Sequence, residues 1–256
     1  MLLTVDVGNT NTVLGLFDGD HLIDSWRITT HARATGDEMA LTFRGLLSSQ
    51  PKVTGLALCS TVPSVLHELR PMIASFFHDI PVVIVEPGTK TGVPILTDNP
   101  KEVGSDRIVN TLAAHHQFGG PCLVVDFGTS TNLDVVSKNG EFLGGALAPG
   151  IDISLDALAN RAAQLRKVEM VRPRSPIGKN TVEALQSGAV YGFAGQVDGL
   201  VDRIIEEIGP VTAVVATGGL ASVVIGESET ITHHDPNLTL TGLRLVFERN
   251  RPQGEA

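Results

Sequence analysis

The sequence has few cysteines, no surplus of basic residues and no long apolar run. Its two cysteines, Cys59 and Cys122, lie far apart inside apolar segments, which predicts buried free thiols rather than a disulfide framework. Nineteen lysines and arginines against 28 aspartates and glutamates give a net charge of −9. The chain therefore lacks the basic surface typical of proteins that bind nucleic acid or anionic membranes, and we expect neither partner.

The apolar segments are too short to cross a bilayer, because none approaches the roughly 18 residues that a spanning helix needs. The N-terminus enters an apolar run without the basic and small-residue regions of a secretory signal. Hydrophobic residues make up 42% of the chain and charged residues 18%, which is the balance of a globular protein with substantial cores. We expect a cytoplasmic protein.

Several common motifs are missing. The chain has neither the Lys-Ser/Thr pattern of a P-loop nor the Gly-x-Gly-x-x-Gly of a Rossmann cofactor site. It also lacks the Gly-x-Ser-x-Gly of a serine nucleophile. Its eight histidines include two adjacent pairs but no spacing typical of metal ligands. Any phosphate site must therefore be built in another way.

Two similar short runs are the most informative feature that is present. Asp6–Thr12 follows the apolar residues 2–5, and Asp126–Thr131 follows the apolar residues 122–125. In each, Asp ends a strand-like segment and is followed by Gly and by short hydroxyl or amide side chains, which allow close backbone approach and supply donors. A carboxylate at a strand tip can hold a hydrated cation. The runs lie about half the chain apart, which predicts a duplicated domain with a phosphate-binding cleft.

Apolar periodicity predicts an α/β fold whose two halves share one plan. In the first half we expect strands at residues 2–7, 11–18, 21–28, 56–59 and 82–85, with helices at 38–47 and 63–77. In the second half we expect strands at 122–126, 131–137, 142–148 and 211–216, with helices after residue 150 and from 181 to about 208. A helix at about 102–117 ends at Gly119-Gly120, where we place the boundary between domains 1–118 and 119–256.

The long helix that follows Lys179-Asn180 carries two stripes. The apolar stripe consists of Val182, Leu185, Ala189, Phe193, Val197, Leu200, Ile204 and Ile208. The second consists of Gly188, Gly192, Gly195 and Gly199. Each glycine costs a helix about 1 kcal/mol relative to alanine, so another backbone is expected to approach closely. Tight packing within the chain and a subunit interface are both compatible with this pattern.

Three further segments have both a structural and a functional interpretation. The run Gly104–Arg107 lies in the first turns of a helix, where free N–H groups favour anions; Asp106 and Arg107 form either a solvated charge pair or a general base with an anion clamp. The run Leu143–Gly150 is either a β-bulge leading into a helix or a backbone approach to substrate. Asn180 or Thr181 caps the long helix, or Thr181 reaches a ligand.

These runs, in this order and together with Thr217-Gly218-Gly219, make the chain resemble the type III pantothenate kinases from residue 1 to about residue 250. That family belongs to the superfamily of acetate and sugar kinases, Hsp70 and actin. The resemblance implies two ribonuclease-H-like, actin-like ATPase domains with a cleft between them. It also implies ATP-dependent phosphorylation of pantothenate, the first step of coenzyme A biosynthesis, by a homodimer.

The resemblance also implies roles for individual residues. The ATP phosphates would contact Asp6, Val7, Gly8, Asn9, Thr10, Asn11, Thr12 and Val13, and Asp6 would hold Mg²⁺ through water. Pantothenate would contact Gly104, Ser105, Asp106, Arg107 and Thr181, and Asp106 would accept the proton of its hydroxyl. Asp126 would bind the monovalent cation, K⁺ or NH₄⁺, and Thr129 would contact ATP. Phosphoryl transfer depends on positioning and charge neutralisation, which such residues supply.

The chain departs from the family at two places. Many members have a tyrosine where this chain has Thr97, and Thr-Phe where it has Asn132-Leu133. Neither change removes a charged group, so we expect altered substrate packing with activity kept. The alternatives are a non-catalytic relative resembling the transcriptional accessory factors and another small-molecule kinase of the superfamily. A base beside an anion clamp favours the enzyme, because a pure binder needs no base.

Overall fold

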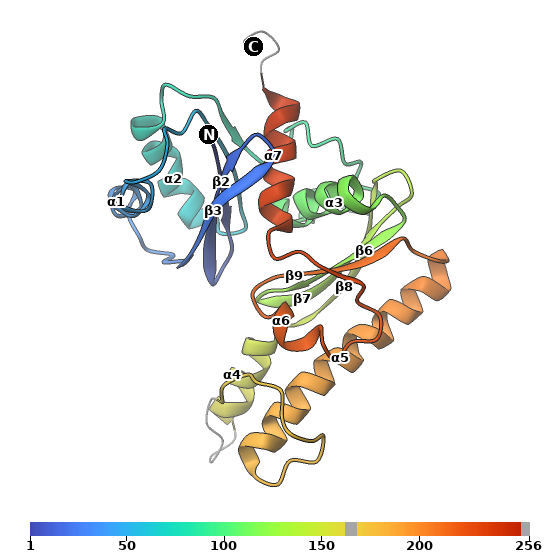
Figure 1. The fold of residues 1–256 in the computed structure, drawn as a ribbon. Helices are drawn as coiled ribbons and strands as arrows, with labels where there is room; N and C mark the ends of the chain where they lie inside the picture. The colour runs from blue at the N-terminus through green and yellow to red at the C-terminus, as the bar shows by residue number, and fades with distance from the viewer. Residues whose placement is uncertain (162–167, 252–256) are drawn as a thin grey trace. The chain divides into compact units, whose positions relative to one another are not determined.

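The computed structural model describes residues 1–161 and 168–251, which fall into two compact units (Figure 1). The first unit contains residues 1–93, 99–113 and the described residues from 239 onward, and the second contains residues 94–98 and 114–238. These units differ from the expected division between residues 118 and 119 in three places. Residues 94–98 and 114–118 belong to the second unit, and the last helix belongs to the first. The domain boundary as such stays a prediction.

The first unit is built on a five-stranded sheet. Its strands are β1 (Leu2–Val7), β2 (Asn11–Asp18), β3 (His21–Thr29), β4 (Gly55–Ser60) and β5 (Val82–Ile84). Their order is β3-β2-β1-β4-β5. Strand β1 is antiparallel to β2 and parallel to β4. All five predicted strands of this half are confirmed, because apolar runs and turn residues such as Gly19, with φ of 59°, set their limits.

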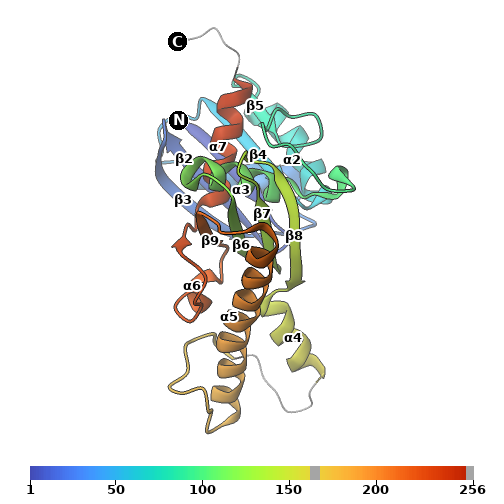
Figure 2. The ribbon, with the colours of Figure 1, turned by 90° about the vertical axis from the view of Figure 1, so that its right-hand side faces the viewer.

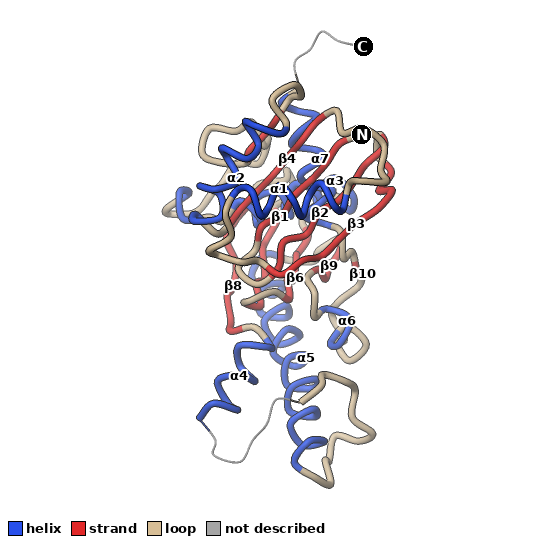
Figure 3. The backbone as a smooth tube through the Cα atoms, turned by 90° about the vertical axis from the view of Figure 1, so that its left-hand side faces the viewer, coloured by secondary structure: helices blue, strands red, loops and turns tan. Residues whose placement is uncertain are grey.

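Helices α1 (Gly36–Leu46) and α2 (Pro63–Phe76) cover one face of this sheet (Figure 3). Alternate residues of β1, namely Leu3, Val5 and Val7, form the core with these helices. The other face, which carries Thr4 and Asp6, is covered by α7 (Leu238–Asn250): a Cβ built at Gly15, the partner of Thr4, would lie 2.8 Å from Cδ1 of Leu240. The sequence reasoning did not predict α7.

A single turn of 3₁₀-helix, η1 (Pro100–Glu102), precedes α3 (Ser105–Phe118). The helix predicted for residues 102–117 therefore begins three residues later than expected, at Ser105. The beginning of α3 packs tightly on α7 in the first unit, where Gly242 of α7 lies against the backbone carbonyl of Val109. This contact places residues 104–107 over the face that carries Asp6.

The second unit repeats the plan of the first. Its strands are β6 (Cys122–Phe127), β7 (Ser130–Val136), β8 (Phe142–Pro149), β9 (Ala213–Thr217) and β10 (His233–His234). Their order, β10-β9-β6-β7-β8, matches that of the first sheet when β6 takes the place of β1. Strand β6 is antiparallel to β7 and parallel to β9, so the predicted duplication is confirmed in strand order and direction.

The helices of the second unit are α4 (Ile151–Arg161), α5 (Thr181–Ile208) and the short α6 (Ala221–Val224). Figure 2 shows α4 beside the N-terminal part of α5. The middle of α5 enters the core through Ala194, Val197 and Val201. Val182, the first member of the predicted apolar stripe, is 48% exposed.

The glycines of α5 are not packed against the described residues of their own chain. Among the described residues, nothing lies within 4 Å of a Cβ built at Gly188, Gly192 or Gly195, and only a side-chain nitrogen of Arg203 lies that close at Gly199. Tight packing within the chain is therefore a wrong interpretation of this stripe.

Strand β8 contains the expected bulge. Gly144 and Gly145 have φ of 108° and 156°, the register with β7 shifts between Val135 and Val136, and a side chain at Gly145 would collide with the carbonyl of Leu133. The bulge thus accounts for both glycines. Cys59 and Cys122 are free and buried, as predicted.

We predict that Gly242→Ala destabilises the protein although alanine favours helix. The added methyl group would collide with the backbone carbonyl of Val109, which cannot rotate away, and overpacking of this kind costs about 1–3 kcal/mol. Gly45→Ala is the matched control: Gly45 also lies in a helix, is exposed and has open space around it, so we expect a gain of about 0.5–1 kcal/mol. Thermal and urea unfolding would measure both, and equal effects would contradict the packing argument.

Candidate functional site

The first predicted phosphate run forms the tight hairpin between β1 and β2. The Gly8 N–H donates to the carbonyl of Asn11 at 3.0 Å, and the Thr30 N–H donates to the carbonyl of Thr10 at 2.9 Å. These bonds fix the backbone while the side chains of Asn9 and Thr10 stay exposed. The hairpin is therefore rigid in its backbone and offers an amide and a hydroxyl group to a ligand.

The residues of this run lie on two faces of the sheet. Asp6 pairs with Val13, whereas Val7 pairs with Thr12, and paired residues share a face. Thr12 is buried, and its Oγ1 lies 2.9 Å from Oγ1 of Thr30. Val7 and Thr12 line a cavity of about 370 Å³ beneath α1, on the face opposite Asp6. Any contact of these two residues with a ligand beside Asp6 must come from their backbone.

The surroundings of Asp6 disfavour the ionised form of its carboxyl group. Its burial raises its pKa from 3.8 to about 7, and the charge of Asp106 contributes to this rise. A hydrogen bond from the Cys59 thiol, with Sγ 3.3 Å from Oδ1, and the more distant charge of Arg27 oppose the rise. The structure therefore brings Asp6 and Asp106 together in the first unit, where the charge of Asp106 disfavours the ionised form of Asp6.

The start of α3 explains why Gly, Ser, Asp and Arg follow one another. Gly104 has no side chain where the Asp106 carboxylate lies, and a Cβ there would collide with Oδ1. The Ser105 hydroxyl donates to the carbonyl of Ser60 at 3.4 Å and so links α3 to the end of β4. The backbone N–H of Arg107 donates to Oδ1 of Asp106 at 2.9 Å and fixes the orientation of the carboxylate.

Asp106 is half-buried, and burial raises its pKa, while the backbone N–H and the guanidinium group of Arg107 counteract this rise. Asp106 and Arg107 are thus both half-buried, and the role of Asp106 as a general base stays a prediction. A carboxylate with a raised pKa takes up a proton more readily than an exposed aspartate does, which suits a general base.

The second run forms a turn of the same kind in the second unit. The Gly128 N–H donates to the carbonyl of Ser130 at 3.0 Å. A Cβ built at Gly218, whose φ is 92°, would lie 2.5 Å from Oδ1 of Asp126 and 2.6 Å from the carbonyl oxygen of Phe127. A carboxylate and a carbonyl oxygen therefore converge above Gly218, and hard cations prefer such oxygen ligands. Thr129 lies at this turn, where its carbonyl accepts from the Gly150 N–H at 3.1 Å.

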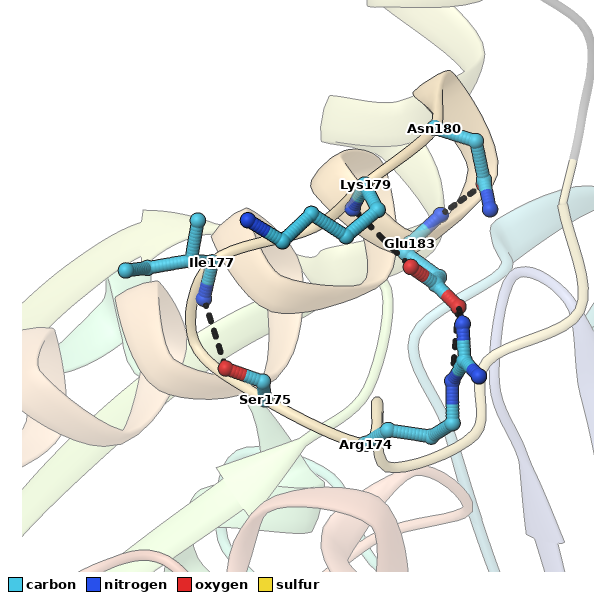
Figure 4. A network of polar contacts seen from close by, with 6 residues as sticks. All are labelled: Arg174, Ser175, Ile177, Lys179, Asn180 and Glu183. Carbon is cyan, nitrogen blue, oxygen red and sulfur yellow. Dashed lines mark hydrogen bonds and ion pairs between the residues drawn. The ribbon is translucent and has the colours of Figure 1, made fainter.

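Thr181 is the first residue of α5 and is exposed. The capping role belongs to Asn180, whose Oδ1 accepts from the Glu183 N–H at 2.9 Å (Figure 4). Glu183 accepts in return from the Lys179 N–H at 2.9 Å and from Arg174; the N–H bond, followed by the bonds from Arg174, lowers the pKa of Glu183. This network leaves the Thr181 side chain out of the cap.

The residues fit metal ions that are shared with a substrate. In the described ranges, no group of three or more His, Cys, Asp or Glu side chains could hold a metal by itself. Mg²⁺ commonly binds through one or two carboxylates together with waters and substrate phosphates. The raised pKa of Asp6 fits such an ion, because a nearby cation would favour the ionised carboxylate. The oxygens above Gly218 fit a monovalent cation.

Comparisons with known proteins agree on one family. A family model described as type III pantothenate kinase matches residues 2–203. The type III pantothenate kinase of Frankia casuarinae is 69% identical over 98% of this chain and 100% of its own length. That of Acidothermus cellulolyticus is 64% identical over 99% of this chain and 100% of its own.

Solved structures share the fold at low identity. The component A of (R)-2-hydroxyglutaryl-CoA dehydratase from Acidaminococcus fermentans gives a TM-score of 0.56 at 16% identity, covering 96% of this chain and 95% of its own. The ROK hexokinase from Thermus thermophilus gives 0.51 at 17% identity, covering 96% and 97%. The two ribonuclease-H-like domains expected from the sequence are thus confirmed as the fold class.

We predict that Asp6→Asn stabilises the protein in Mg²⁺-free buffer above pH 7. Between pH 3.8 and about 7 the native carboxyl holds a proton that the unfolded chain releases, so the free energy of unfolding falls as the pH rises. Asparagine removes this loss, which amounts to at most about 4 kcal/mol. Urea unfolding at about pH 4 and pH 8 should show a gap that opens with pH. A constant gap would contradict the raised pKa of Asp6.

Proposed function

The chain belongs to the type III pantothenate kinase family, and from this premise we propose how its residues transfer a phosphoryl group from ATP to pantothenate in coenzyme A biosynthesis. The observation that carries the proposal is the half-buried Asp106 carboxylate. It is oriented by the Arg107 N–H and lies close enough to Asp6 to influence its pKa. The proposed general base, Asp106, and the proposed nucleotide-binding residue Asp6 therefore lie in the same unit.

Asp106 accepts the proton of the primary hydroxyl group of pantothenate. The oxygen becomes more acidic only as its bond to phosphorus forms, so Asp106 orients the hydroxyl first and takes the proton late. Gly104, Ser105 and Arg107 complete the pantothenate site. Arg107 supplies the positive charge for the carboxylate of pantothenate, and the free N–H groups at the start of α3 favour the same anion.

The hairpin between β1 and β2 binds the phosphates of ATP. Its backbone from Asp6 to Val13 and the exposed side chains of Asn9 and Thr10 supply short donors. Asp6 holds Mg²⁺ through water, and the ion neutralises charge on the phosphates when it is bound. The raised pKa of Asp6 supports this assignment, because a nearby cation would favour the ionised carboxylate.

We assign the remaining roles to the second unit. Asp126 binds K⁺ or NH₄⁺ together with carbonyl oxygens of its turn, and Thr129 contacts ATP. Thr181, which the cap of α5 does not use, contacts pantothenate. The buried Thr97 hydroxyl has no hydrogen-bond partner in the described part of the chain, which supports a substrate contact at the position where many relatives carry tyrosine. A cytoplasmic location belongs to the same proposal.

The glycine stripe of α5 supports a homodimer. A helix with Gly188, Gly192 and Gly195 on its surface gives up helix stability, although no described residue of the chain packs against these glycines. A second copy of the helix can approach such a surface closely and recover the loss in van der Waals contact. We infer that this stripe forms the subunit interface.

Asp106→Asn should abolish most of the turnover. The amide can still accept the Arg107 N–H but cannot take up a proton, so we expect kcat to fall by about 10²–10⁴-fold while the affinities for ATP and pantothenate change little. A coupled ADP-release assay with Mg²⁺ and K⁺ measures this, and Asp37→Asn, an exposed residue in the first turn of α1, should behave like wild type. Wild-type protein without pantothenate-dependent turnover would refute the enzyme, and an active Asp106→Asn would refute the base.

Replacing Gly192 and Gly195 together by leucine should convert a dimer into a monomer. Leucine fills the space that the backbone of the other subunit needs, while α5 itself gains helix propensity. Light scattering should give the mass of two chains for wild type and of one chain for the variant. Gly45→Leu, at an exposed glycine in α1, should stay dimeric. A monomeric wild type, or a variant with the mass of two chains, would contradict the interface.

A further inference from the structure

Cys59 lies directly beside Asp6. Strands β1 and β4 are parallel, and their register pairs Asp6 with Cys59, so the two side chains stand on the same face. The thiol is fully buried, with 0% exposure, and its Sγ lies 3.3 Å from Oδ1 of Asp6. This contact joins the centre of the first sheet to a residue of the proposed phosphate site.

The thiol is the donor in this hydrogen bond when Asp6 is ionised, because a carboxylate can only accept. Oδ1 of Asp6 accepts this hydrogen bond. The other carboxylate oxygen accepts none from the described residues.

Two charged side chains, Asp106 and Arg27, also act on the Asp6 carboxylate. Asp106 disfavours the ionised form of Asp6, and Arg27 favours it from β3. Arg27 pairs with Val13, which in turn pairs with Asp6, so it lies two strands away on the same face. A carboxylate between a repelling and an attracting charge needs a local contact to hold one orientation, and the thiol supplies it.

The second unit has a hydroxyl donor at the equivalent position. Asp126 of β6 corresponds to Asp6, and its partner on the parallel strand β9 is Thr217, which is 2% exposed. Both sheets therefore place a small, buried S–H or O–H group opposite the aspartate at the strand tip.

We propose that Cys59 is a positioning residue for the kinase reaction: its thiol holds Oδ1 of Asp6 and leaves the second carboxylate oxygen for hydrated Mg²⁺. This inference rests on the proposed role of Asp6 in the kinase. The same strand end also supports the base, because the carbonyl of the next residue, Ser60, accepts from the hydroxyl of Ser105 at the start of α3. The end of β4 thus contacts both Asp6, which we propose holds Mg²⁺, and the start of α3, which carries the proposed base.

The test compares Cys59→Ala and Cys59→Val, which remove the donor and respectively leave or fill its space, with Cys59→Ser, which keeps a donor. We expect the first two to raise the Mg²⁺ concentration for half-maximal rate by about 10-fold, as is usual for groups that orient a metal-binding side chain. The KM for pantothenate should not change. Cys59→Ser should recover most of the loss.

A binding measurement separates this effect from catalysis. Calorimetry with a non-hydrolysable ATP analogue should show weaker binding to Cys59→Ala and Cys59→Val only when Mg²⁺ is present. Cys122→Ala is the matched control, because this thiol is also buried in a strand and its pKa is raised by burial alone. It should lose stability but keep the Mg²⁺ dependence of wild type. Whichever of the two donor-free variants folds is sufficient for the comparison.

The outcomes distinguish the two proposals. If wild type turns over pantothenate and the folded donor-free variant shows the Mg²⁺ dependence of wild type, the positioning role of Cys59 is wrong and the kinase stands. The same holds if Cys59→Ser fails to recover the loss. If wild type shows no turnover and no Mg²⁺-dependent binding of the analogue, the proposed function itself fails.

Discussion

The burial of two neighbouring carboxylates in one unit is the constraint on which the site depends. Burial raises the pKa of Asp6, at the end of β1, and of Asp106, in α3, and the charge of Asp106 further disfavours the ionised form of Asp6. Gly104 leaves space for the Asp106 carboxylate, which accepts the Arg107 N–H. The Cys59 thiol donates to the Asp6 carboxylate. A cation bound in the proposed site would favour the ionised form of Asp6 and so offset the cost of burying it.

The sequence predicted most of the fold because the two halves repeat a simple local code. Apolar runs that end in Asp and Gly marked β1 and β6 correctly, and turn residues marked the strands that follow them. Helix α7 was missed although Leu240, Leu243 and Phe247 recur at helical spacing and are buried. Its membership of the first unit could not be predicted, because no local pattern tells which of two similar sheets a distant helix covers.

The sequence indicated the acidic residues of the candidate site but not their surroundings. The motif containing Asp6 and the motif containing Asp106 were each found, whereas their proximity depends on the packing of α3 over the sheet. Cys59 was recognised only as a buried thiol, because its contact with Asp6 follows from the register of two parallel strands. The faces of the sheet also separate Thr12 from Asp6, although the two lie in one short run.

The return of α7 to the first sheet has a consequence for the order of synthesis. The second unit is nearly continuous in the chain, whereas the first needs α7, in which Phe247 contacts Gly55 and Gly242 contacts Val109. On the ribosome the later unit can therefore close while the earlier one still waits for its last helix. The half of the protein that is translated first, and that carries both Asp6 and Asp106, is the half that is finished last.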